Sequence, residues 1–439
     1  MKGAAMNDDP VKLLAEYLRI NTTNPPGNES RAVTFFQDIF AREGIETKTY
    51  ESAPGRTSIR AILRGSGAQK PLILLNHMDV VPAEKQEWSA DPFGGEIIDG
   101  FLYGRGALDM KSLGIMELLA LLDIQKSGIK PCRDVIFLAT ADEEAGGKHG
   151  IQFLLENHPD DFSAEFVINE GGFGISGLFP DRPVFMISTA EKGLCWLKVT
   201  CTGQPGHGSV PHGQSALEKL NAAIYRLLAE KTPVTLTPII KRYFHNLAAG
   251  WDFLEPFVND QKAETLERIL EQTGLIQMPQ ISAMLRNTIS LTQIHSGNKA
   301  NVIPASAEAT FDIRLLPGQS LEEYLAIIKE KMGDDALRFE ILAQSESSTS
   351  PPDTKYFHLI ADVIRQDYPE ALVTPSLLFA TSDSRLFRKH GITTYGFCPA
   401  VIGLEDIPKI HGIDERISLE NMINGTRLFT KIVKKLCLE

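Results

Sequence analysis

The 439-residue chain is 43% hydrophobic and 23% charged, which are values of an ordinary globular protein. Its formal net charge of −12 argues against nucleic acid or an anionic membrane surface as a partner, because both bind basic protein faces. No stretch reaches the roughly 18 consecutive apolar residues that a membrane-spanning helix needs, so we expect no membrane association.

The length exceeds that of one ordinary hydrophobic core and predicts two domains, or one large domain that carries an insertion. The N-terminal segment 1–17 has no uninterrupted apolar run, and Asp8 and Asp9 stand where a signal peptide would be hydrophobic. The five cysteines include no Cys-x-x-Cys pair, and their odd number leaves no complete disulfide framework. We therefore predict a reduced, cytoplasmic setting.

The first half of the chain alternates between helical and strand patterns. The expected elements are helices at 11–18 and 31–43, a strand at 44–50, a buried strand at 72–75, a helix at 113–122, and strands at 134–140 and 166–168. The run at 72–75 is apolar at every position, and the strand at 134–140 contains the continuous apolar run 135–139, which indicates strands buried on both faces. This pattern predicts an α/β fold in which helices cover both faces of a mixed sheet.

Three of these strands end in residues that can bind metal or transfer protons. Strand 72–75 leads to His77, strand 134–140 leads to Glu143 and Glu144, and strand 166–168 leads to Glu170. Functional residues of such sheets gather at the carboxyl ends of the strands, so we expect these side chains to share one edge. Each feature alone has a plain structural reading, such as a loop histidine or a solvated Glu-Glu pair, and only their agreement favours a site.

The pattern changes after about residue 193. Segment 194–202 alternates as a strand, 231–285 is mainly helical, and strands are expected at 287–295, 302–303 and 308–315. We interpret 193–318 as an inserted α+β domain. Residues 1–192 and 319–439 then form the catalytic domain, with expected helices at 321–332 and 356–367 and a strand at 394–398.

Two neighbouring divalent ions need a bridging carboxylate and separate ligands on each side. Asp109 follows a Gly-Arg-Gly turn and is the natural bridge. His77 and Glu170 complete one ion, and Glu144 and the distant His411 complete the other. Glu143 is left as a general base, and Asp79 is placed to accept the proton on the second ring nitrogen of His77. Histidine and carboxylate ligands without cysteine favour zinc, with cobalt or manganese as alternatives.

The segments NHMDVVP, GRGALDMKS, ATADEEAGG, INEGG, GQPGHGSVP, NVIPASAEATFDIRLLPG, TSDSRLF and KIHGIDERIS follow one another along almost the whole chain. In this order they resemble the successive motifs of the aminoacylase, carboxypeptidase S, acetylornithine deacetylase and succinyl-diaminopimelate desuccinylase family of dinuclear metallohydrolases. The resemblance implies the same metal ligands, the same acid/base residue Glu143 and the same orienting role for Asp79. It also implies a cis peptide after Asp109.

The resemblance further implies that the inserted domain is a lid and a homodimer interface. His207 would stabilise the oxyanion, and Asn301 and Arg314 would hold the carboxylate of the substrate. Alone, His207 reads as a turn histidine and Arg314 as a charge at a strand edge.

We expect a metal-dependent hydrolase that cleaves amide or peptide bonds of N-acyl-amino acids or small peptides with a free carboxylate. The segment FATSDSR lacks the Gly-rich run that the desuccinylases carry before Ser-Asp, and it is closer to the carboxypeptidase S and aminoacylase-like members. A dipeptidase and a succinyl-diaminopimelate desuccinylase remain alternatives. A non-catalytic binding protein on the same scaffold is a rival of another class, but such proteins lose ligands or the base, and here all six positions are filled.

Overall fold

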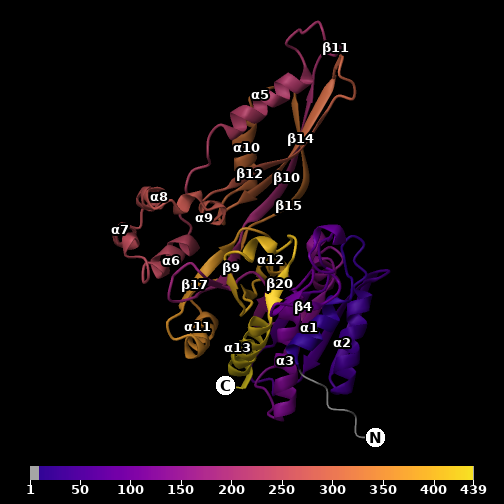
Figure 1. The fold of residues 1–439 in the computed structure, drawn as a ribbon, viewed down its shortest axis with the longest axis vertical. Coiled ribbons are helices and arrows are strands. Elements are labelled where there is room, and N and C mark those ends of the chain that lie inside the picture. Colours follow the sequence, from indigo (N-terminus) through magenta and orange to yellow (C-terminus); the bar gives the residue numbers. More distant parts are fainter. Residues whose placement is uncertain (1–8, 439) are drawn as a thin grey trace. The chain divides into compact units, whose positions relative to one another are not determined.

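The computed structural model describes residues 9–438 (Figure 1). Part of the segment that argues against a signal peptide, residues 1–8, lies outside the described residues. The chain divides into two compact units, each described by itself below. The first comprises Met1–Thr189, Ser350–Ser376 and Ser382–Glu439, and the second comprises Ala190–Thr349 and Leu377–Thr381.

The first unit is built on a mixed sheet with the strand order β1-β2-β6-β3-β7-β18-β9-β8-β19. These strands are β1 (Glu46–Ala53), β2 (Arg56–Leu63), β3 (Leu72–His77), β6 (Val135–Thr140), β7 (Phe166–Asn169), β8 (Gly174–Ser176), β9 (Val184–Glu191), β18 (Thr393–Gly396) and β19 (Val401–Gly403). β17 (Leu372–Leu378) also pairs with β9, and β4 (Glu96–Ile98), β5 (Phe101–Tyr103) and β20 (Arg416–Ser418) form a small separate sheet.

Helices cover this sheet on both faces, as the sequence predicted. Leu72 and Leu74 of β3 belong to one apolar cluster, while Ile73 and Leu75 belong to the other. The helices of the first cluster are α1 (Pro10–Leu18), α2 (Ser30–Arg42), α3 (Lys111–Ser127), α11 (Lys355–Asp367) and α13 (Leu419–Leu438). Those of the second are α4 (Ile151–Asn157) and α12 (Ser384–Lys389). α3 is buried around most of its circumference because it packs on the sheet and lies beside α13 (Figure 1).

The strands that carry the predicted site residues run in the same direction. β3 pairs in parallel with β6 on one side and with β7 on the other. Their carboxyl ends therefore meet at one edge of the sheet, where residues 77, 143–144 and 170 follow.

Asp161 ties the two outer strands β1 and β2 to the short 3₁₀ helix at Pro159–Phe162. Its carboxylate accepts hydrogen bonds from Lys48 Nζ at 2.6 Å, Tyr50 Oη at 2.8 Å and Arg60 Nη1 at 2.7 Å. Burial alone would raise the pKa of Asp161, but these donors outweigh it and lower the pKa to about 2.

Replacing Asp161 with asparagine should therefore destabilise the protein by about 1–2 kcal/mol at neutral pH, discounted for partial exposure. Because the folded-state pKa is below the unfolded one, this contribution is fully present above about pH 4 and is lost as the pH falls through 2. Urea midpoints at pH 7 and pH 3 should show a smaller deficit at pH 3. An equal deficit at both pH values, or the same deficit in Asp160→Asn, would contradict this account.

The second unit contains a four-stranded antiparallel sheet in the order β12-β14-β10-β15. Its strands are β10 (Gly193–Thr202), β12 (Thr288–Ser296), β14 (Ser306–Leu315) and β15 (Leu337–Ser345), and a separate pair is formed by β11 (Gly206–His207) and β13 (Val302–Ile303). α5 (Ala216–Leu228) and α10 (Leu321–Met332) pack on one face of the four-stranded sheet. β16 (Ser348–Thr349) pairs with the end of β9.

The predicted boundary at residue 318 differs from this arrangement. β15 pairs with β10 from Leu337 to Ser345, and α10 packs against α5. The segment 319–349 therefore completes the second unit instead of returning to the first. The sequence pattern missed this because a helix followed by a strand fits either unit, and only the pairing partner distinguishes them.

The segment 231–285 is helical, as predicted. It contains α6 (Pro238–Leu247), α7 (Glu255–Asp260), α8 (Ala263–Gln272) and α9 (Pro279–Leu285). The buried Lys192 donates from Nζ to the carbonyl oxygens of Ala283 at 2.9 Å and Arg286 at 2.7 Å, and so attaches the end of α9 to the start of β10. Among the described helices, none is long and apolar enough to cross a membrane.

Candidate active site

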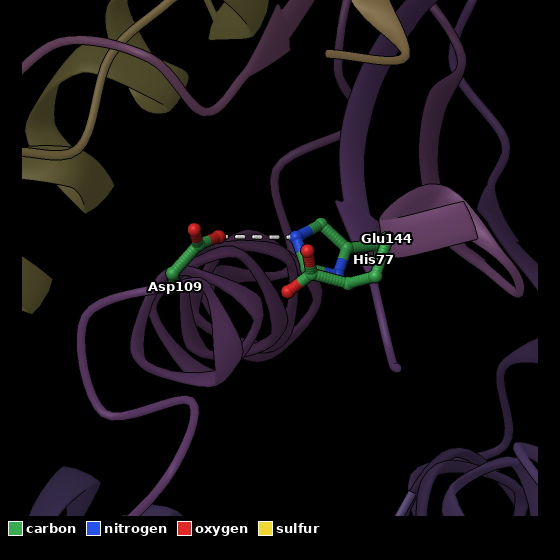
Figure 2. A group of neighbouring side chains, drawn as sticks. All are labelled: His77, Asp109 and Glu144. Atoms are coloured by element: carbon green, nitrogen blue, oxygen red, sulfur yellow. Dashed lines mark hydrogen bonds and ion pairs between the residues drawn. The ribbon is translucent and has the colours of Figure 1, made fainter. Parts of the chain in front are cut away.

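His77 ends β3 and is 2% exposed. Figure 2 shows its ring directed at Asp109, with Nε2 at 3.2 Å from Asp109 Oδ1. Nε2 also lies 3.7 Å from Glu170 Oε1. The other ring nitrogen, Nδ1, lies 2.9 Å from the main-chain oxygen of Asp79, which assigns the proton to Nδ1. Nε2 is then left with a lone pair for a metal ion.

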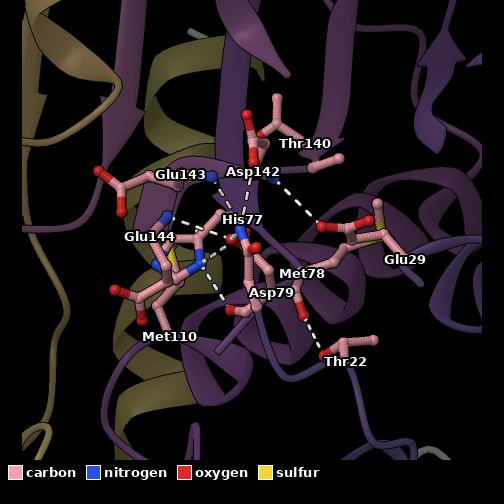
Figure 3. Close-up of polar contacts among 12 residues, drawn as sticks. Thr22, Glu29, His77, Met78, Asp79, Met110, Thr140, Asp142, Glu143 and Glu144 are labelled. Atoms are coloured by element: carbon pink, nitrogen blue, oxygen red, sulfur yellow. Dashed lines mark hydrogen bonds and ion pairs between the residues drawn. The ribbon is translucent and has the colours of Figure 1, made fainter. Parts of the chain in front are cut away.

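Asp79 acts on His77 through its main chain, and the predicted role of its carboxylate is corrected accordingly. The closest carboxylate oxygen lies 3.6 Å from His77 Nδ1, beyond hydrogen-bond distance. The two carboxylate oxygens instead accept the backbone N–H groups of Glu143 and Glu144, both at 3.1 Å (Figure 3). Asn24 Nδ2 adds a third donor at 2.8 Å. Asp79, which follows β3, thus links the end of β3 to the loop that follows β6.

Asp109 lies between the two histidines. Its Oδ1 faces His77 and its Oδ2 lies 3.1 Å from His411 Nε2. One short side chain therefore directs an oxygen at each histidine, as a carboxylate that bridges two ions must. The peptide bond between Asp109 and Met110 is cis, as the resemblance implied.

His411 and Glu144 complete the other side of the cluster. His411 Nε2 lies 3.3 Å from Glu144 Oε2, while Glu144 Oε1 is buried and has no hydrogen-bond partner among the described residues. The ligand atoms of His77, Asp109 and Glu144 lie within 4.8 Å of one another. All five predicted metal ligands are thus brought together from parts of the chain that are far apart in sequence.

The charges of this cluster favour a cation. Burial and the neighbouring Asp109 raise the pKa of Glu170 well above its usual range, and burial also raises the pKa of Glu144. Hydrogen bonds to Asp109 and Glu144 raise the pKa of His411 to about 10. The closely packed carboxylates, with Glu144 Oε1 buried and without a partner among the described residues, offer oxygen atoms whose charge a bound cation would neutralise. The residues therefore fit two divalent ions with oxygen and nitrogen ligands.

Glu143 neighbours the ligands and is partly exposed. Burial and the nearby charges of Asp383 and Glu144 raise the pKa of Glu143 well above its usual range. Its ligand atom also lies within 4.8 Å of those of His77 and Glu170, so geometry alone would admit Glu143 as a metal ligand.

Some residues near this cluster were not assigned a role from the sequence. Asp383 is 1% exposed and accepts a hydrogen bond from Thr140 Oγ1 at 3.0 Å, at the end of β6. Asp142 has a positive φ of 69° and accepts from Arg56 Nη2 at 2.7 Å. The backbone N–H of Asp142 donates a hydrogen bond to Oε1 of the buried Glu29 at 3.2 Å (Figure 3). The only sequence signal was that both lie in motifs, TSDSRLF and ATADEEAGG.

The other three predicted residues belong to the second unit. His207 lies in β11 and is exposed, and its Nδ1 lies 2.8 Å from Ser209 Oγ. The main-chain oxygen of Asn301 accepts from Gly208 N at 2.9 Å, so these two residues are neighbours. Arg314 in β14 donates from Nε and Nη2 to Asp312 at 2.7 Å and 3.1 Å. Nη1 of Arg314 is buried without a hydrogen-bond partner in the described part of the chain.

Residues 73–435 match the family model described as Peptidase family M20/M25/M40. The chain belongs to this family. N-fatty-acyl-amino acid synthase/hydrolase PM20D1 of Xenopus tropicalis is 33% identical over 359 residues, which are 80% of this chain and 69% of that protein. Aminoacylase-1 of Sus scrofa is 28% identical over 443 residues, covering 99% and 97% of the two chains.

A solved structure shares the fold of this M20 chain. It is the M20 family metallo-carboxypeptidase Sso-CP2 from Sulfolobus solfataricus, with a TM-score of 0.72 and 20% sequence identity over 97% of this chain and 98% of that chain. Together these findings confirm the resemblance to the aminoacylase and carboxypeptidase family. The M20 chain is a metal-dependent amidohydrolase.

Proposed function

We propose that this M20 enzyme hydrolyses the amide bond of N-acyl-amino acids or small peptides whose amine side carries a free carboxylate. The observation that carries the proposal is Asp109, which directs one oxygen at His77 and the other at His411 with Glu143 close by. The names of two relatives, an N-fatty-acyl-amino acid hydrolase and an aminoacylase, support this class of substrate.

Two divalent ions would be held by His77 and Glu170 on one side and by His411 and Glu144 on the other, with Asp109 shared. The donor set favours zinc, with cobalt or manganese as alternatives. When bound, such ions polarise a carbonyl group and make a water molecule more acidic. Asp79 holds the backbone of Glu143 and Glu144 at this point.

Glu143 is the general base in this proposal. One of its carboxylate oxygens takes the proton from the attacking water and then gives it to the nitrogen of the leaving amine, so the group returns to its starting state. The position of Glu143 beside His77 and Glu170 supports this role. His207 is proposed to stabilise the oxyanion, and Arg314 and Asn301 to bind the carboxylate of the substrate. The unpartnered Nη1 of Arg314 supports the last role.

A hydrolysis panel tests this proposal directly. N-acyl-amino acids with short and long acyl chains and several dipeptides would each be compared with the matching amide that lacks the free carboxylate, in zinc, cobalt and manganese. We expect cleavage of the carboxylates only. Arg314→Ala should raise KM by about 10-fold or more for these substrates, as loss of a charge-assisted hydrogen bond implies.

The panel also separates the alternatives. Cleavage of dipeptides alone would favour a dipeptidase, and cleavage of N-succinyl-diaminopimelate would favour a desuccinylase. If protein that holds metal cleaves no amide with a free carboxylate, the proposed substrate class is wrong. The role of Arg314 in binding the substrate carboxylate is then the first assignment to be withdrawn.

We also propose a homodimer formed through the second unit, with a small molecule or short peptide as the substrate and neither nucleic acid nor a membrane surface as a partner. β12 is an edge strand that carries Leu291 and Ile294 at 38% and 49% exposure, which supports an interface there. Sedimentation velocity should report twice the chain mass, and a monomer at micromolar concentration would contradict the proposal.

A reducing, cytoplasmic location is proposed as well. All five cysteines are free, and Cys195, Cys201, Cys398 and Cys437 are buried thiols, which supports this setting. Fractionation of cells that express the full chain would test it, and recovery in the medium or in an oxidising compartment would contradict it.

A further inference from the structure

A buried ion pair joins two loops of the first unit that lie far apart in the sequence. Arg105 Nη1 lies 2.7 Å from Glu415 Oε2, and the two side chains are 3% and 0% exposed. Arg105 belongs to the loop that presents Asp109, and Glu415 follows the turn that presents His411. Neither residue is among the five metal ligands, and neither is the proposed base.

Glu415 holds the loop before Asp109 through its backbone. Its Oε1 accepts the N–H groups of Leu108 at 2.7 Å and Asp109 at 3.0 Å, and its Oε2 accepts that of Gly106 at 3.0 Å. A buried carboxylate that accepts several N–H groups makes strong, directional hydrogen bonds. The amide nitrogen of Asp109 itself is therefore fixed.

Arg105 holds the turn of His411 in the same way. Its Nη2 donates to the carbonyl oxygens of Gly412 at 2.9 Å and His411 at 3.3 Å, and its guanidinium lies over the ring of Trp88. His411 has a φ of +60°, a left-handed conformation that a residue with a side chain adopts only when its surroundings enforce it. Bonds to two successive carbonyl oxygens supply such a constraint.

We propose that Arg105 and Glu415 are a positioning pair that sets Asp109 and His411 at the spacing needed to bind the metal ion on the His411 side. This inference rests on the proposed function. The pair contacts the backbone of both segments and makes no hydrogen bond to the side chains of Asp109 and His411, which remain available to bind metal. His77 is instead carried by strand β3 and bonded to Asp79, so the ion on the His77 side depends less on the pair.

The cost of burying the pair strengthens the inference. Two buried charges gain little net stability compared with apolar residues of the same size, because desolvation offsets their attraction. Loop geometry alone also does not require both partners to be charged. A pair that accepts or donates at five backbone atoms around two ligands is better explained by the precision that a metal site needs.

The test uses the full chain and the variants Glu415→Gln and Arg105→Lys, with Arg133→Gln as the control. Arg133 is 2% exposed and pairs with Glu165 at 3.3 Å, but it precedes β6 at the opposite end from the site. Two measurements are made: amide hydrogen exchange of the metal-free proteins, and stepwise binding of Zn²⁺ or Co²⁺ by calorimetry with a competing chelator.

We expect Glu415→Gln to accelerate amide exchange in peptides that cover 104–112 and to weaken binding of the ion on the His411 side by about 10–100-fold, the range seen when groups behind a metal ligand are removed. The ion on the His77 side shares Asp109 and should be weakened less, and the more affected ion should be the one that His411→Ala loses. Arg105→Lys keeps a positive charge beside Glu415 but has no second nitrogen to donate to the turn of His411. Amide exchange should therefore become faster in peptides that cover 409–416 and stay unchanged in peptides that cover 104–112. Arg133→Gln should leave both ion affinities unchanged.

Two outcomes would overturn the inference, and they are distinguishable. If the wild-type protein binds two ions and both variants bind them with unchanged affinity, the inference fails and the proposed function stands. If the wild-type protein binds fewer than one ion, the proposed function fails, and the inference fails with it. Should Glu415→Gln not fold, the selective loosening of the His411 turn in Arg105→Lys decides the question.

Discussion

Glu143→Gln should lower kcat by about 10²–10⁴-fold, the contribution typical of a general acid–base group, while both metal ions stay bound. Glutamine has nearly the same shape and can still be held by its backbone N–H, which donates to Asp79. It cannot take a proton from water. The measurements are steady-state kinetics on a substrate identified by the hydrolysis panel and metal content after gel filtration.

Glu156→Gln is the matched control for this variant. Glu156 is an exposed residue of α4 whose carboxylate is bonded to Gln152, so the same change of chemistry there should leave kcat unaltered. Turnover near the wild-type rate with both metals bound would refute Glu143 as the base. Loss of one ion would instead identify Glu143 as a ligand, the alternative that its distance to His77 and Glu170 admits.

Asp109→Ala should abolish measurable activity and release both ions. The reason is geometric: Asp109 directs one oxygen at each histidine, so its loss removes a ligand from both ions and leaves their charges unshielded from each other. Glu144 and Glu170 each serve only one side, so replacing either should spare one ion. Metal analysis of protein purified without chelator, together with the panel assay, measures both effects.

The control for Asp109→Ala is Asp123→Ala, which removes a carboxylate from the same region of the chain. Asp123 lies near the end of α3, is 47% exposed and pairs with Lys434. Both ions and full activity should be retained. If Asp109→Ala keeps one tightly bound ion, the shared ligand is a different residue, and the assignment of the two sides must be revised.

The sequence predicted His77, Glu144 and Glu170 as candidate ligands because each stands at or shortly after the end of a strongly patterned strand. The apolar runs of β3 and β6 allowed the ends of these strands to be located to within a residue or two, and His77 is the last residue of β3 while Glu143 follows β6. His411 lies in a turn without a periodic pattern. It could be assigned only because the second ion needed a further ligand and because its motif resembles that of the family. The family match later confirmed the class of enzyme that these motifs indicated.

Hydrogen-bond partners were less predictable than positions. The alternation of residues in an extended segment placed Asp79 on the same side as His77. The Asp79 carboxylate nevertheless accepts hydrogen bonds from the backbone N–H groups of Glu143 and Glu144 and not from His77. Those donors come from a loop more than 60 positions away. Local periodicity carries no information about such competition. The same limit explains the boundary at 318, where only the pairing of β15 with β10 assigns the segment to the second unit.

By itself, the sequence determined the mixed α/β sheet, the five candidate ligands and the candidate base, because buried strands and the polar residues at their ends leave local patterns. The tertiary structure alone decided how those residues are held. Asp79 bonds to the loop of Glu143 and Glu144. Glu415 accepts backbone N–H groups of the segment 106–109, and Arg105 donates to the carbonyl oxygens of His411 and Gly412. Such contacts depend on loops that meet only after the chain has folded, so no local pattern records them.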